Sequence, residues 1–114
     1  MKKYRFFNML NMYCHAININ YARISRTEFK NQFFNAVQFL NQKKGYLSHR
    51  VSIGSEEKKF CVFEIFFSNE SDMNEFSKYK FPEWNEFLGS IEALVEITEN
   101  SFPVETLGAD GCSG

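Results

Sequence analysis

Apolar and polar positions along this chain change period several times, and each change marks a new element. Between about Tyr13 and Ile24 the two kinds of residue alternate, which is the period of a strand with one buried face. Ile17 and Ile19 share one face of that strand, and Asn18 and Asn20 share the other. The first strand is therefore predicted to carry two amides on the side away from the core.

A helix is predicted next, because Ser25 to Glu28 has the sequence of a capping box. Apolar residues then recur with helical spacing up to about Gln42 and give the helix one buried stripe. Gly45, which follows two lysines, suits the end of such a helix. We interpret this segment as a packing element.

Two further strands are predicted over residues 46–53 and 60–67, with a turn between them. Residues 60–67 are apolar almost throughout, which indicates burial on both faces. Tyr46 is placed on the same face of its strand as Arg50 by alternation. A hairpin that pivots near the middle of the turn sets Arg50 opposite Glu64, so we expect an ion pair there.

The remaining chain predicts a helix in two pieces and a last strand. Ser71 is expected to cap the first piece, and Pro82 suits the first turn of the second. The last strand covers about residues 95–99, and residues 102–104 form either a short edge or an exchange segment. The resulting βαββαβ order predicts an α+β, ferredoxin-like fold with an antiparallel four-stranded sheet.

The length of 114 residues suits one domain. We place it at residues 13–107, between an N-terminal extension, 1–12, and a flexible small-residue tail, 108–114. The net charge of -1 provides no broad cationic field, so nucleic-acid binding is not expected. No segment approaches the roughly 20 apolar residues of a membrane span, so no membrane partner is expected either.

Cysteine and histidine are few and scattered along the chain. The spacing of Cys14, Cys61 and Cys112 matches neither a disulfide framework nor paired metal ligands. A reducing cytoplasm is the simplest location. We expect no metal and no cofactor.

One face of the predicted sheet is left without helices, because both helices of this topology cover the other face. Phe60, Val62 and Phe66 share the helix-free face with Glu64, and exposing three such side chains would leave a large apolar patch. A second copy of the sheet is expected to cover them. The chain is thus predicted to form a homodimer, a dimeric α+β barrel, with the strand amides and the Arg50–Glu64 pair turned inward.

Over about residues 13–99 the chain resembles the antibiotic biosynthesis monooxygenase family of the dimeric α+β barrel superfamily. The stretches that carry the resemblance are Ile17-Asn18-Ile19-Asn20-Tyr21, Lys44-Gly45-Tyr46-Leu47, and Phe63-Glu64-Ile65-Phe66-Phe67-Ser68 leading into residues 73–84. The resemblance implies either cofactor-free oxygenation of quinols and anthrones or haem degradation. It also implies that an Asn of strand one and aromatic residues of the second helix lie near substrate, which by position are Asn18 or Asn20, then Phe76, Phe81 and Trp84.

The resemblance departs from its haem-degrading branch, whose members carry an iron-ligating His on the second helix. Here the histidines are His15 and His49, both on strands and both expected on the helix-covered face, with His49 as a core imidazole. The prediction is therefore a cofactor-independent monooxygenase of a small aromatic or quinol-type substrate. Asn18 and Asn20 would fix the substrate oxygen, and Arg50 would favour its anion.

Alternatives remain open for every one of these residues. The two amides can satisfy each other, and Arg50 with Glu64 can be a structural cross-strand pair instead of an anion holder and base. Phe76, Phe81 and Trp84 can wall a flat substrate or belong to the core. The alternative function is a non-catalytic small-molecule-binding or scaffold dimer of the same fold.

Overall fold

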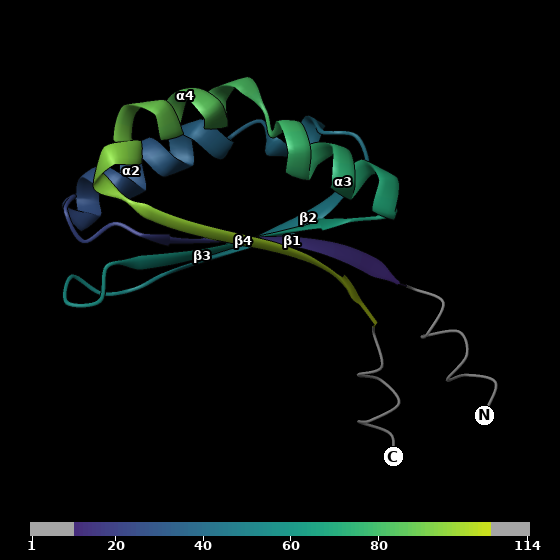
Figure 1. Ribbon diagram of the computed structural model, residues 1–114, viewed down its shortest axis with the longest axis horizontal. Coiled ribbons are helices and arrows are strands. Elements are labelled where there is room, and N and C mark those ends of the chain that lie inside the picture. Colours follow the sequence, from purple (N-terminus) through teal and green to yellow (C-terminus); the bar gives the residue numbers. More distant parts are fainter. Residues whose placement is uncertain (1–10, 106–114) are drawn as a thin grey trace, which may run out of the picture.

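The computed structural model describes residues 11–105, and Figure 1 shows helices covering one face of a sheet whose other face is bare. The sheet has four antiparallel strands in the order β2-β3-β1-β4. The elements are β1 (Met12–Asn20), α2 (Arg26–Val37), the 3-10 turn η1 (Leu40–Gln42), β2 (Tyr46–Ile53), β3 (Phe60–Phe67), α3 (Glu70–Tyr79), α4 (Pro82–Ile91), the 3-10 turn η2 (Glu92–Leu94) and β4 (Glu96–Val104). This order confirms the ferredoxin-like prediction. The predicted extension 1–12, except its last two residues, and the tail 108–114 lie outside the described residues.

Helix α2 begins where the capping box predicts. Ser25 Oγ accepts a hydrogen bond from the backbone N–H of Glu28 at 3.1 Å. The helix ends at Val37, earlier than predicted, and the chain tightens into η1 before Gly45 turns it with φ +78°. None of the helices in the described part of the chain is long and apolar enough to cross a membrane.

The second helical segment starts earlier than predicted. Asn69, not Ser71, is its cap, because the Asn69 side chain accepts a hydrogen bond from the Asp72 N–H at 2.8 Å. Pro82 opens α4 as expected. Between the two pieces stands Lys80, which has φ +57° and is the one non-glycine residue with positive φ in residues 11–105.

Strand β4 is longer than predicted. It continues from residue 99 to Val104 and pairs with β1 along its whole length, from Asn20 opposite Glu96 to Met12 opposite Val104. Pro103 is tolerated within it because β4 lies at the edge of the sheet, where a missing backbone donor costs no ladder bond. Residues 102–104 are therefore the end of this edge strand.

The strand registers settle which side chains share a face. Arg50 pairs with Glu64, as predicted, and Ile17 and Ile19 point toward the helices while the neighbouring asparagines do not. The predicted face of Tyr46 is wrong. A bulge between Tyr46 and Ser48 shifts the register, so that Tyr46 lies opposite Phe67 and packs against the core.

The core between the sheet and the helices is aromatic. Phe33 of α2 meets Phe63 of β3 and Trp84 of α4 edge to face, with ring centroids 5.0 and 5.8 Å apart. Within one chain β3 is fully buried on this side only. On its helix-free side Phe60 is 44% exposed, and the apolar run that indicated burial on both faces is half uncovered.

Two glycine substitutions test the local geometry in opposite directions. In Gly45→Ala the new Cβ meets the Asp72 carboxylate, and the backbone is in the left-handed region. We expect it to lower the free energy of unfolding by about 1–3 kcal/mol. Gly89→Ala, in open space on α4, should raise it by about 1 kcal/mol. Urea unfolding of both variants measures this, and equal effects would contradict the described turn.

Candidate functional site

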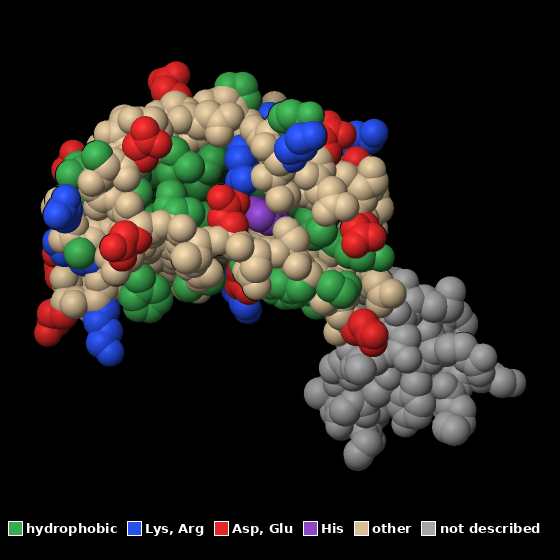
Figure 2. All heavy atoms as spheres, viewed as in Figure 1, with side chains coloured by type: hydrophobic (Ala, Val, Ile, Leu, Met, Phe, Trp, Pro, Cys, Tyr) green, Lys and Arg blue, Asp and Glu red, His purple; other side chains and the backbone are tan. Residues whose placement is uncertain are grey.

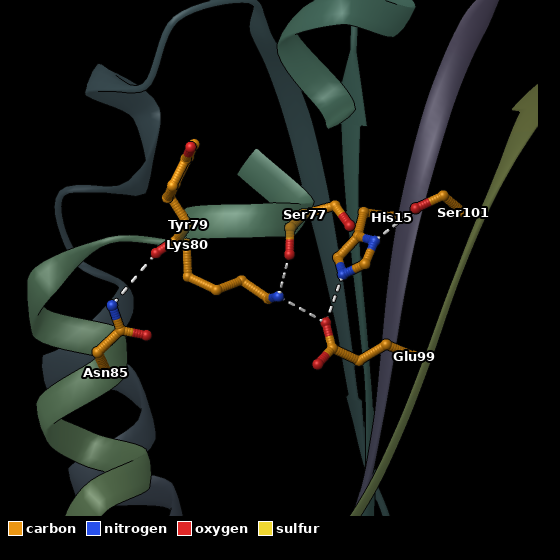
Figure 3. A network of polar contacts seen from close by, with 7 residues as sticks. All are labelled: His15, Ser77, Tyr79, Lys80, Asn85, Glu99 and Ser101. Carbon is orange, nitrogen blue, oxygen red and sulfur yellow. Dashed lines mark hydrogen bonds and ion pairs between the residues drawn. The ribbon is translucent and has the colours of Figure 1, made fainter. Parts of the chain in front are cut away.

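A cluster of polar side chains lies between the sheet and the α3–α4 junction. His15 comes from the middle of β1 and is 2% exposed. The register of β1 with β4 sets Ser101 directly opposite it, and Glu99 lies two residues along β4 on the same face. Lys80 reaches in from the junction, and Figure 3 shows the four side chains converging.

The contacts within this cluster are short. His15 Nε2 lies 2.6 Å from Glu99 Oε1, and His15 Nδ1 lies 2.7 Å from Ser101 Oγ. Lys80 Nζ lies 2.8 Å from the same Glu99 oxygen and donates to the Ser77 carbonyl at 2.5 Å. A carboxylate accepts and cannot donate, so Nε2 carries the imidazole proton and Nδ1 accepts from the Ser101 hydroxyl.

The charges of the cluster follow from its burial. Burial lowers the pKa of His15 and outweighs the opposing influence of Glu99, while Lys80 lowers it further. Burial alone would raise the pKa of Glu99, but the hydrogen bonds and charges of Lys80 and His15 lower it overall. At neutral pH the cluster is therefore an ammonium, a carboxylate and a neutral imidazole. An imidazole in that state, oriented by a carboxylate, is suited to general-base chemistry.

Aromatic side chains border the cluster. Phe76 of α3 meets the His15 ring edge to face at 6.1 Å, and Phe81 stacks on Phe76 at 5.8 Å. Trp84 lies 6.1 Å beyond Phe81, and its indole N–H has no hydrogen-bond partner among residues 11–105. Figure 2 shows an apolar patch under the helices on this side, with an acidic side chain, a histidine and basic groups next to it.

The polar residues predicted as a site lie on the opposite face of the sheet. Asn18 and Asn20 line an open groove of about 200 Å³ together with Phe60 and Thr98. Asn20 Oδ1 also accepts a local hydrogen bond from the Ala22 N–H at 3.1 Å, which favours a turn role for that amide.

Arg50 and Glu64 form the expected ion pair on the same helix-free face. Arg50 Nη2 lies 2.8 Å from Glu64 Oε1, with the Arg50 side chain 68% exposed. An exposed cross-strand pair of this kind contributes little stability and leaves the guanidinium accessible to an anion. Whether it holds a substrate stays a prediction.

The sheet separates these residues from the predicted aromatic wall. Phe76, Phe81 and Trp84 are 6%, 3% and 1% exposed and belong to the core. The structure therefore does not bring the amides and the aromatics into one pocket. It brings the aromatics together with His15, Glu99 and Lys80 instead.

The placement of the histidines was predicted only in part. Both lie on the helix-covered side, as expected, but His49 is exposed and is not a core imidazole. It sits on the edge strand β2, where Tyr46 Oη lies 2.6 Å from its Nδ1. Within residues 11–105, no group of three or more potential metal ligands lies together.

Comparison with known proteins gives the fold a class. No family model matches the sequence, and no curated protein matches it. Solved structures do match, and the chain has the ferredoxin-like fold found in antibiotic biosynthesis monooxygenase proteins.

Three of these structures show the extent of the likeness. SnoaB, a cofactor-independent oxygenase from Streptomyces nogalater, superimposes with a TM-score of 0.64 at 12% identity over 81% of this chain and 91% of that one. A proposed antibiotic biosynthesis monooxygenase from Nitrosomonas europaea gives 0.65 at 8% identity over 85% and 91%. A conserved protein from Methanosarcina mazei gives 0.57 at 12% over 90% and 98%. At these identities the likeness establishes the fold.

The state of His15 predicts how stability responds to acid. The unfolded chain protonates this imidazole near its ordinary pKa of 6.5, but the folded chain does so only at lower pH. The contribution of the neutral His15 to the free energy of unfolding is therefore complete above about pH 6.5 and is lost as the pH falls below that value. Glu99 acts in the same direction, but its contribution is lost only below its ordinary value of 4.5.

Urea unfolding at pH 7.5 and pH 5.5 measures the effect of His15 apart from that of Glu99, because both pH values lie above the ordinary pKa of a glutamate. We expect the native protein to lose more stability between these two pH values than His15→Gln, whose amide does not titrate and can bond the same neighbours. His49 is unchanged in both proteins and serves as the internal control. Equal losses would contradict a buried, neutral His15.

Proposed function

We propose that the protein is a cofactor-independent monooxygenase of a small aromatic or quinol-type substrate, with His15 as its general base. The observation that carries the proposal is the neutral imidazole held between Glu99 and Ser101 at 2.6 and 2.7 Å beside aromatic side chains. The proposal is also supported by comparison with solved structures, because the chain shares its fold with a cofactor-independent oxygenase. The homodimer and a cytoplasmic location are parts of the same proposal.

The proposed reaction requires a base that removes a proton from the substrate, and it requires no cofactor. An anthrone or quinol that loses a proton becomes an electron-rich anion, which can itself reduce oxygen. Its recombination with the reduced oxygen gives a hydroperoxide, and loss of water leaves a carbonyl. For an anthrone the balance is CH2 + O2 → C=O + H2O, so no external reductant is required.

The residues of the cluster divide this work. His15 Nδ1 is the atom that takes the proton, and the exposed Ser101, whose hydroxyl bonds Nδ1, is placed to pass it inward. Glu99 holds the imidazole by Nε2 and stabilises the imidazolium that forms. Phe76 and Phe81 exclude water from that side of the imidazole.

The helix-free face supports the alternative function. Its groove of about 200 Å³ beside Asn18 and Asn20, with Arg50 and Glu64 on the same face, suits a bound small molecule. A non-catalytic binding dimer would use this face alone. Asn18, Asn20 and Arg50 keep their predicted roles only if the chemistry takes place here.

The homodimer is proposed on the same face. Phe60 is 44% and Phe102 36% exposed there, and Val62 and Phe66 are only partly buried. Side chains of this size seldom stay uncovered together. A second copy, packed sheet to sheet, would cover them and enclose the groove.

Oxygen consumption against a panel of anthrones and hydroquinones tests the activity. We expect uptake by the native protein and about a 100-fold loss in His15→Gln, because general-base catalysis contributes at least that much. The matched control is Asn18→Ala/Asn20→Ala, which should retain uptake. Loss in the amide variant with full activity in His15→Gln would move the site to the helix-free face. Saturable binding without uptake would favour the alternative function.

Sedimentation equilibrium at micromolar concentration tests the dimer. We expect the mass of two chains for the native protein and a shift toward one chain in Phe60→Glu, since a carboxylate would be buried in the apolar contact. Asn31→Glu, an exposed change on α2, which covers the other face of the sheet, is the control. A native protein that stays monomeric at every concentration contradicts the sheet-to-sheet contact.

A further inference from the structure

We propose that Lys80 is a positioning residue that keeps His15 in its neutral, proton-accepting form. The inference rests on the proposed function, since it names what prepares the base of that reaction. Lys80 does not touch the imidazole. It acts through Glu99, because its Nζ and His15 Nε2 both lie within 2.8 Å of the same oxygen, Oε1.

The backbone at Lys80 is held in an unfavourable conformation. Its φ of +57° is in the region that non-glycine residues rarely adopt, so the backbone is strained there. The Lys80 N–H closes the end of α3 on the Phe76 carbonyl at 2.7 Å, and Pro82 starts α4 two residues later. Glycine would serve such a junction without strain, so the side chain has a reason to be there.

The direction of that side chain supplies the reason. Lys80 turns inward, with its side chain 13% exposed, and its ammonium contacts the Glu99 carboxylate and the Ser77 carbonyl. Lysine side chains rarely give up water unless they are paired. Here the pairing partner is the carboxylate that orients His15.

Competition for Glu99 explains the effect on His15. The Glu99 carboxylate, whose side chain is 33% exposed, is stabilised by a cation nearby, and either an imidazolium or an ammonium can provide it. With Lys80 in place Glu99 already has its cation, so His15 can remain neutral at Nδ1. Without Lys80 the imidazole would take up a proton to neutralise Glu99 and would cease to be a base.

No other charged group in the described chain contributes to this balance. Glu99 and Ser101 of β4 bond the two ring nitrogens, and Phe76 of α3 packs against the ring. On the other side of β1, Ile65 of β3 lies opposite His15. The charges that act on the pKa of His15 are those of Glu99, which raises it, and Lys80, which lowers it.

The experiment follows the ring signals of both histidines by NMR as the pH is varied. In Lys80→Gln, which keeps a donor and removes the charge, His15 should titrate at higher pH than in the native protein, and His49 should not move. Lys80→Arg should restore the native titration. Lys80→Gly suits the positive φ and should shift His15 as Lys80→Gln does, which separates the charge from the backbone strain.

Lys78→Gln is the matched control. It removes an exposed ammonium from α3, and that ammonium lies over the Tyr79 ring instead of contacting Glu99. With an anthrone that the native protein oxidises, kcat/KM of Lys80→Gln at pH 7 should fall about 10-fold or more. The activity should recover at higher pH, where the imidazole loses its extra proton. A purely structural role for Lys80 would not produce that recovery.

The outcomes separate this inference from the proposed function. An unshifted His15 titration in both Lys80→Gln and Lys80→Gly overturns the role of Lys80, whatever the protein does with oxygen. A shifted titration in a protein that oxidises none of the panel supports the role of Lys80 and counts against the oxygenase. A shift of equal size in Lys78→Gln would also overturn the inference, since any lost cation would then suffice.

Discussion

The pairing of β1 with strands on both sides is the constraint on which the rest of this structure depends. Every helix-facing residue of β1 has a β3 residue on one side and a β4 residue on the other. Where those neighbours are apolar, as Cys61 and Ile97 are at Ile19, the result is core. Where β4 contributes Glu99 and Ser101, the same geometry holds an imidazole by both ring nitrogens.

The buried imidazole at the centre of this polar cluster is tolerated only because its neighbours satisfy it. An imidazole at 2% exposure would be costly without partners, and Glu99 and Ser101 supply one for each nitrogen. The carboxylate in turn needs Lys80, which the strained junction between α3 and α4 directs inward. Removing one member leaves a neighbour without its hydrogen-bond or ion-pair partner, so the cluster behaves as a unit.

The fold could be predicted from the sequence because its signals are local. Alternation in β1, the capping box at Ser25 and the proline at the start of α4 each act within a few residues. The Arg50–Glu64 pair followed from a short hairpin, where turn length fixes the register. The bulge at Tyr46 and the cap at Asn69 were missed, because each depends on a competition between neighbouring residues.

The candidate site could not be predicted in the same way. His15 was recognised as facing the helices, but its partners are more than 80 residues away on β4. That strand was predicted to end at Glu99, and no local signal gives its register with β1. Lys80 is still harder to predict from the sequence, since only a positive φ at the junction directs its side chain toward the sheet. Long-range pairing decides the site, whereas short-range pattern decides the fold.

The central claim is that His15 is a neutral imidazole with its proton on Nε2 and an unprotonated Nδ1 that accepts the Ser101 hydrogen bond. Nitrogen-15 NMR of the histidine ring at pH 7 measures this directly, because protonated and unprotonated ring nitrogens have widely separated chemical shifts. The account predicts a protonated Nε2 and an unprotonated Nδ1 for His15. Two protonated nitrogens, or a proton on Nδ1 alone, would contradict it.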